Sequence, residues 1–158
     1  MARLILRRGT LAEALASARD VAHAAGGYEP RAAKGWPLAR AVAHAARGIE
    51  YSLTGYPVAK PAWFRATVGR IALGKFLRQG YMRHDLAALI PGEPDAGDAR
   101  GEPSLDAAIG RLEVAIMRFH AHSGELAPHF AYGPVGRGDY ERIHAMHLAD
   151  HLGAFGAG

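Results

Sequence analysis

The sequence predicts an all-α protein, folded as a four-helix bundle in a single domain over residues 1–158. Apolar residues recur every three or four positions in four separate segments, which is the period of an α-helix. Helix-capping residues stand at the ends of these segments, and strand-like alternation is absent beyond the first few residues. A chain of 158 residues, 49% of them hydrophobic, is long enough to bury one core.

The four bundle helices are predicted over residues 10–25, 37–54 and 104–123, and from the segment Gly136–Asp139 to about Gly153. Thr10 and Glu13 form a capping box at the start of the first helix. Pro37 opens the second, because a proline at the first helical position lacks only an N–H that would be unpaired anyway. Ser104 and Asp139 are placed to accept from the free amino-terminal N–H groups of the last two helices.

The connection from Gly55 to Pro103 is much longer than an ordinary link between bundle helices, which predicts a long crossover. An extra amphipathic helix is predicted within it over 62–78. Its inward-facing residues are expected to be Phe64, Val68, Ile71, Ala72 and Phe76. The segment from Pro91 to Gly97 is rich in proline and glycine and is predicted to be irregular and exposed.

The chain contains no cysteine, which excludes disulfides, thiolate metal ligands and a protein thiol nucleophile. Any metal ion must therefore be held by histidine and carboxylate. Residues 1–8 have only three apolar residues between arginines, far short of a signal peptide or a spanning helix of about 20 residues. These features favour a soluble, cytoplasmic protein without a membrane partner.

The positive charge is concentrated in residues 60–84. This basic segment contains six lysines and arginines and no acidic residue, within a chain of net charge +4. Such a segment either forms a solvated face or attracts anionic partners, small or polymeric. Its aromatic residues Trp63, Phe64 and Phe76 are expected in the core, which makes a nucleic-acid partner unlikely, because single strands require exposed stacking aromatics.

Three histidines in the last predicted helix indicate metal chemistry. His147 and His151 are four residues apart and differ by about 40° around the helix, while His144 and His151 differ by about 20°. Imidazoles four residues apart are close enough to bind one transition-metal ion. His147 and His151 could thus supply part of the ligand set of a metal site. A solvent-exposed helix face that carries two histidines explains the H-x-x-x-H pair equally well. His144 is either a supporting base or part of the rim.

A third protein ligand must come from another helix, and His44 is the candidate. It lies about 40° from the apolar stripe of the second helix, so it faces the bundle interior or its rim. A buried imidazole needs a partner, and either a metal ion or a carboxylate would serve. His44 is therefore either a ligand or a core histidine bonded to the backbone or to a glutamate. His120 and His122 are two residues apart, cannot share a helix face and are expected on the surface.

Several motifs together resemble the DinB-like (YfiT-like) family of metal-binding bundles, and most closely a branch described only as a domain of unknown function. Segments that carry the resemblance cover most of the chain from residue 37 onward: Leu38 to His44, Ser52 to Pro57, Val68 to Met82, Leu126 to Gly133 and Tyr140 to Phe155.

The resemblance implies a dimeric four-helix bundle that binds a divalent ion through His44, His147 and His151. Relatives in this branch often read His-His-Leu where this chain has Asp150, His151 and Leu152, so a fourth ligand or supporting histidine is missing from that position. In the expected site, the nitrogens of the three histidines lie about 2.0–2.3 Å from an ion, or within about 4 Å of one another without one. Imidazole binds Zn, Ni, Fe and Cu, so the ligand set is compatible with each of these four metals.

This resemblance implies that the protein is a metal-dependent enzyme. The activity that it suggests is a transfer reaction that uses a low-molecular-weight thiol. A coordinated thiol loses its proton and supplies the nucleophile that a cysteine-free chain lacks. A metal-dependent hydrolase would use the same ligands and open position. A non-catalytic bundle that binds a ligand or partner around a structural ion is the alternative, because no general acid or base accompanies the histidines in an H-E-x-x-H pattern.

Overall fold

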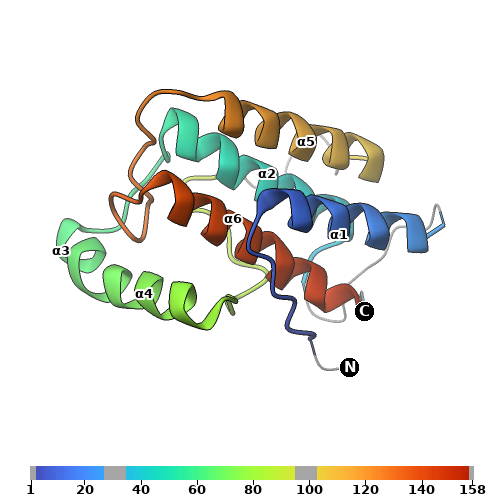
Figure 1. Cartoon of the computed structure of the whole chain (residues 1–158), viewed down its shortest axis with the longest axis horizontal. Helices are drawn as coiled ribbons and strands as arrows, with labels where there is room; N and C mark the ends of the chain where they lie inside the picture. Colours follow the sequence, from blue (N-terminus) through green and yellow to red (C-terminus); the bar gives the residue numbers. More distant parts are fainter. Residues whose placement is uncertain (1–2, 27–34, 95–102, 157–158) are drawn as a thin grey trace.

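The computed structural model describes residues 3–26, 35–94 and 103–156, and this part of the chain is helical without a β-strand. An isolated antiparallel bridge joins His129 and Gly133. In order, the elements are α1 (Leu11–Ala24), α2 (Leu38–Thr54), α3 (Ala62–Phe64), a π-helical turn (Arg65–Gly69), α4 (Arg70–Gln79), α5 (Leu105–Ala121), α6 (Arg137–Leu152) and a 3₁₀ turn (Gly153–Phe155) (Figure 1). The prediction of an all-α protein is confirmed.

Four long helices form the main body. Helix α2 packs against both α5 and α6, while α1 packs against α6 and α5, and α4 lies along α6 (Figure 1). Leu11, Val42, Phe119 and Tyr140 are completely buried between these helices. Because α2 is rich in alanine on its buried face, its backbone lies close to its neighbours. This close packing brings α2 and α6, which are far apart in the sequence, side by side.

The predicted helix ends are mostly confirmed. Thr10 and Glu13 form the reciprocal capping box of α1, and Ser104 accepts from the backbone N–H of Ala107 at the start of α5. Pro37 stands one position earlier than predicted, as the residue that precedes α2. Helix α6 begins within the predicted segment, at Arg137, but Asp139 does not cap it: Gly136 is the residue before the helix, no side chain makes a capping hydrogen bond, and Asp139 lies in the first turn.

The crossover helix differs from its prediction in shape and in the face that it buries. Five residues from Arg65 to Gly69 form a π-helical turn between α3 and α4. A π turn takes more residues than an α turn, so it rotates the following residues away from the positions that an α-helical period predicts. Val68 and Ile71 are therefore 47% and 72% exposed, whereas Leu73 is buried.

Two further predictions for the crossover are wrong. Trp63 is 66% exposed, because α3 has only three residues and no buried side chain. One aromatic residue of the basic segment is thus accessible, contrary to expectation. In the segment from Pro91 to Gly97, residues 95–97 lie outside the described part of the chain, but Glu93 is buried rather than exposed.

Among the described helices, none is both long enough and apolar enough to cross a lipid bilayer.

Candidate metal centre

The structure brings His44, His147 and His151 together. His44 comes from α2 and the other two from adjacent turns of α6, and one ring nitrogen from each lies within 4.8 Å of those of the others. This separation is wider than the expected 4 Å. The ring of His44 lies 5.1 Å from that of His147 and 5.4 Å from that of His151, between centroids. The packing of α2 on α6 therefore creates the cluster that the sequence predicts.

His147 and His151 are held in the neutral form, which is the form that binds a metal ion. Burial is the largest cause and lowers the pKa of both imidazoles well below the usual value. Positive charge on neighbouring histidines lowers these pKa values further, because a second proton in a confined cluster is repelled. At neutral pH both rings therefore offer a lone pair without losing a proton first.

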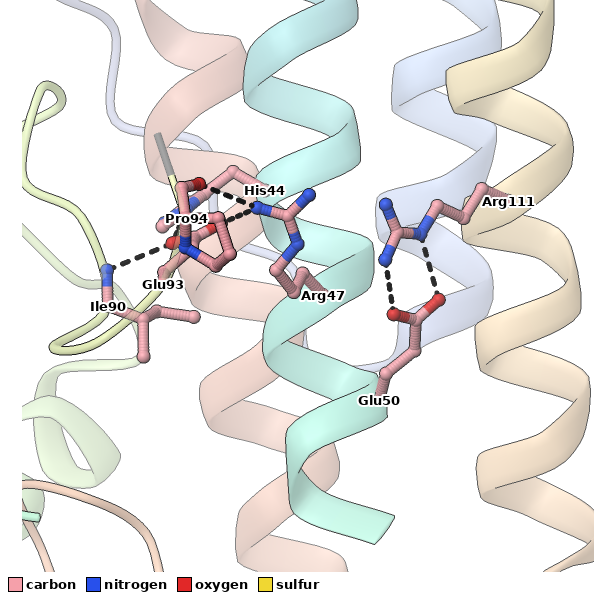
Figure 2. A network of polar contacts seen from close by, with 7 residues as sticks. All are labelled: His44, Arg47, Glu50, Ile90, Glu93, Pro94 and Arg111. Atoms are coloured by element: carbon pink, nitrogen blue, oxygen red, sulfur yellow. Dashed lines mark hydrogen bonds and ion pairs between the residues drawn. The ribbon is translucent and has the colours of Figure 1, made fainter. Parts of the chain in front are cut away.

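His44 is oriented by a buried glutamate. Its Nδ1 lies 3.0 Å from Oε2 of Glu93, which also accepts from the backbone N–H of Ile90 at 3.0 Å (Figure 2). Arg47, one turn after His44 on α2, donates to the other carboxylate oxygen at 2.5 Å. Burial raises the pKa of the Glu93 carboxyl, but the hydrogen bond and charge of His44, the backbone hydrogen bond of Ile90 and the charge of Arg47 together lower it overall. Glu93 is therefore ionised, and its carboxylate accepts a hydrogen bond from the Nδ1–H of His44.

The two readings of His44 are thus compatible. It has the carboxylate partner of a core histidine, yet it also lies in the cluster with His147 and His151. A carboxylate behind the outer ring nitrogen is the usual support of a metal-binding histidine, since it fixes the ring and leaves the other nitrogen bare. Sequence reasoning missed Glu93 because its surroundings are proline and glycine, and only the fold shows that it meets α2.

His84 is a fourth histidine at the cluster that sequence reasoning missed. It follows α4, and its Nε2 lies 3.2 Å from Nε2 of His151. Its ring centroid is 4.7 Å from that of His147. No spacing rule signals His84, because it lies in a loop and is separated from α6 by more than fifty residues. In the sequence, His84 is only the last residue of the basic segment.

Asp150 contacts His84. Its Oδ2 accepts from the backbone N–H of His84 at 2.9 Å and lies 2.7 Å from Nδ1 of the same residue. The second contact is an electrostatic one rather than a well-aligned hydrogen bond. Nε of Arg3 lies 3.2 Å from Oδ1, the other carboxylate oxygen of Asp150. The Asp150 residue is buried, with 4% of its surface exposed. Asp150 therefore supports a histidine from another part of the chain.

The cluster opens onto a cavity of about 260 Å³. His44, His84 and His147 line it, and so does a second group of residues made of His129, Tyr56 and Tyr132. The rings of this second group pack closely, with centroids of His129 and Tyr132 4.2 Å apart. The remaining wall is mainly apolar, formed by Met82, Ala88, Leu89, Ile90, Pro91, Phe130 and Ile143. A small molecule in the cavity would therefore touch both the imidazole cluster and the aromatic group.

The remaining histidines have different positions. His144 is buried, lines the cavity and stacks on Tyr140, and its Nε2 has no hydrogen-bond partner. Burial lowers its pKa to about 3, so it is neutral. His120 is exposed beside Glu141, and His122 is partly exposed and bonds to a backbone carbonyl. The expectation of surface positions for His120 and His122 agrees with the structure.

These residues fit a divalent transition-metal ion. The donors are imidazoles: burial keeps His147 and His151 neutral, and His44 has a carboxylate at Nδ1, which leaves its Nε2 as the free nitrogen. The donor set contains nitrogen only, which favours Zn, Ni, Fe or Cu over the oxygen-preferring Mg and Ca.

Acid should destabilise the protein partly through His129. Burial, followed by the positive charge of His144, lowers the pKa of His129 to about 3. In the unfolded chain its pKa is about 6.5, so between pH 6.5 and 3 the unfolded state binds one more proton and folding stability falls as the pH falls. In His129→Asn the free energy of unfolding should depend less on pH, by up to about 1.4 kcal/mol per pH unit.

Urea unfolding of metal-free protein at pH 7, 6, 5 and 4 measures this dependence. Asparagine keeps an acceptor near the backbone N–H of Ala131, which donates to Nδ1 of His129 at 3.1 Å. The neighbours that face the ring from other elements, Tyr56 and Tyr140, stay protonated throughout this range, because burial raises the pKa of each. Equal slopes for wild type and variant would show that His129 takes up its proton in the folded state.

Comparison with protein families gives one match that covers nearly the whole chain. A family model described as "Protein of unknown function (DUF1569)" matches residues 4–157. Searches of curated proteins and of solved structures found no significant match. The matched range includes all four long helices and every histidine of the cluster. The chain therefore belongs to the DUF1569 family of proteins of unknown function.

Proposed function

We propose that this protein is a divalent-metal-dependent enzyme, with His44, His147 and His151 as metal ligands and a small-molecule thiol as cosubstrate. The observation that carries the proposal is the convergence of three imidazoles from two helices beside a cavity of about 260 Å³. A structural ion needs no adjoining cavity, whereas a catalytic ion needs one for its substrate. The geometry therefore supports a catalytic ion better than a structural one.

The arrangement of helices supports a relationship to DinB-like bundles as part of this proposal. Helices α1, α2, α5 and α6 pack together, the long crossover joins α2 to α5, and the ligands come from the second and last of these four helices. A homodimer belongs to the same proposal, as does a cytoplasmic location. Exposed apolar side chains on α5, Val114 and Met117, are available for contact with a second copy.

The protein residues supply orientation and charge. An ion held by the imidazoles supplies Lewis acidity, which lowers the pKa of a thiol or water molecule that coordinates it. Glu93 fixes the ring of His44 and is itself held by Arg47. Apolar walls exclude water from the substrate and strengthen its electrostatic interactions with the site.

The charge around the cavity favours an anionic substrate. Among the described residues that line the cavity, Lys60 is the only lysine or arginine, and none is an aspartate or glutamate. The Lys60 ammonium lies 5.0 Å from the centre of the Phe64 ring. The basic segment of the sequence therefore contributes Lys60 to the cavity, in a position to hold a carboxylate of the thiol compound.

Cobalt-substituted protein tests the proposal. Adding 3-mercaptopropionate should produce a thiolate-to-cobalt charge-transfer band and release a proton, because only the thiolate coordinates. Lys60→Met should weaken the apparent affinity for 3-mercaptopropionate roughly two- to five-fold, the range for an exposed ion pair, and leave the band itself unchanged.

3-Mercaptopropanol is the matched control ligand, since it has the thiol without the carboxylate. Its affinity should be the same for wild type and Lys60→Met. If neither thiol changes the spectrum of protein that holds cobalt at the three histidines, the thiol-dependent activity is excluded, and hydrolysis or a non-catalytic role must be considered in its place. If both thiols lose affinity equally in the variant, Lys60 does not recognise the carboxylate.

A further inference from the structure

We infer that His84 is a fourth protein ligand of the metal ion and that Asp150 holds it in position. This inference rests on the proposed metal site and extends it to a four-nitrogen site. The resemblance to known bundles implies three ligands only. The additional ligand comes from the loop after α4, outside the four long helices.

The spacing between the nitrogens of His84 and His151 fits coordination of a shared ion. Nε2 of His84 and Nε2 of His151 are 3.2 Å apart. Two ligands of a tetrahedral zinc site, each about 2.05 Å from the ion, are about 3.3 Å from each other. His84 and His151 are therefore already at the separation that a shared ion requires, whereas the nitrogens of His44, His147 and His151 lie within 4.8 Å of one another.

Asp150 determines which nitrogen of His84 is free. Nδ1 lies 2.7 Å from the carboxylate, and without a proton on Nδ1 the two groups would repel each other at this distance. Nδ1 therefore carries the proton in the neutral ring, and Nε2 is the bare nitrogen that faces His151. Glu93 has the same relation to His44, so two histidines from different elements share one pattern of support.

Hydrogen bonds through Arg3 and Leu4 connect the loop that carries His84 to the end of α6. Arg3 donates to the backbone carbonyl of His84 at 3.2 Å, and Arg83 donates to the carbonyl of Arg3 at 2.8 Å. The backbone N–H of Leu4 donates to Gly153 at 2.9 Å, next to the last turn of α6. These contacts place the ring of His84 before any ion binds, as a ligand requires for high affinity.

The position of His84 relative to the cavity has a functional consequence. His84 lines the cavity together with His44 and His147, whereas His151 does not. A fourth imidazole would occupy the position that three ligands leave open. A substrate that coordinates the ion must then compete with His84 or add a fifth ligand.

Metal affinity and cobalt spectra of His84→Ala and Asp150→Asn test the inference, with the exposed His120→Ala as control. Zinc competition with a chelator should show a loss of roughly 10- to 100-fold for Asp150→Asn, the range for an outer carboxylate, and at least that for His84→Ala. The visible cobalt spectrum of His84→Ala should shift as one nitrogen donor is replaced, while His120→Ala should match wild type.

Wild-type protein labelled with ¹⁵N-histidine provides a measurement that does not depend on a variant's folding. On zinc titration, the Nε2 resonance of His84 should shift together with those of His44, His147 and His151, and complete its shift at one equivalent. If His84 does not shift, or if His84→Ala keeps wild-type affinity and spectrum, the inference is wrong and the three-histidine site stands. If no histidine of wild type shifts, the proposed metal site itself fails.

Discussion

Replacing His147 with alanine is expected to abolish stoichiometric binding of Zn or Ni. His147 is one of only two ligands that α6 contributes, and its ring lies within 5.1 Å of those of both His44 and His151, between centroids. Without His147, the predicted ligand set keeps only His44 from α2 and His151 from the following turn of α6. Because outer-shell changes alone typically cost 10- to 100-fold in metal affinity, loss of a direct ligand should exceed that range. Calorimetric titration of metal-free protein measures it.

His122→Ala is the matched control. His122 follows α5, is partly exposed and bonds to the backbone carbonyl of Glu125 at 3.2 Å. It has no contact with the cluster, so its replacement should leave both stoichiometry and affinity unchanged. Equal losses in the two variants would mean that binding is spread over surface histidines, and the proposed site would have to be abandoned.

Gly69→Ala is expected to destabilise the fold by several kcal/mol, the scale of overpacking against a rigid neighbour. A Cβ atom at Gly69 would lie 1.9 Å from the backbone carbonyl oxygen of Ala131. The obstacle is backbone, so it cannot rotate away as a flexible side chain would. Relief requires the π-helical turn to move away from the turn at 129–133, which carries three residues of the cavity wall.

Gly110→Ala provides the comparison, because a Cβ at this position in the interior of α5 meets no atom within 4 Å. Alanine in a helix interior is more favourable than glycine, so this variant should gain roughly 0.5–1 kcal/mol. Urea unfolding of both variants gives the two free energies. A Gly69→Ala protein as stable as wild type would show that the π turn is not packed tightly against the turn at 129–133.

The two buried carboxylates connect the site to the stability of the fold. Glu93 and Asp150 are 8% and 4% exposed and lie directly behind histidines of the cluster. Each also has an arginine on its other oxygen, Arg47 and Arg3 respectively. The charge of each carboxylate is thereby balanced without a metal ion, so the fold can form before an ion binds. Both carboxylates then remain in place to support the ligands.

The sequence by itself determined the helical class, the capping of α1 and α5, and the sharing of a helix face by His147 and His151. These features depend on residues within one or two turns of each other, where the period of 3.6 residues fixes relative direction. His44 was predicted because its position relative to the apolar stripe of α2 is also a local property. Its proximity to α6 was inferred from the resemblance to DinB-like bundles.

Only the tertiary structure decided which loop residues reach the cluster. His84, Glu93 and Lys60 belong to the long crossover, where no period relates one residue to the next, and their positions follow from how the crossover packs on α2 and α6. The π-helical turn has the same origin, since the close approach of Gly69 to Ala131 involves two segments more than sixty residues apart. Local periodicity carries no information about such contacts, which arise only when helices and loops pack together.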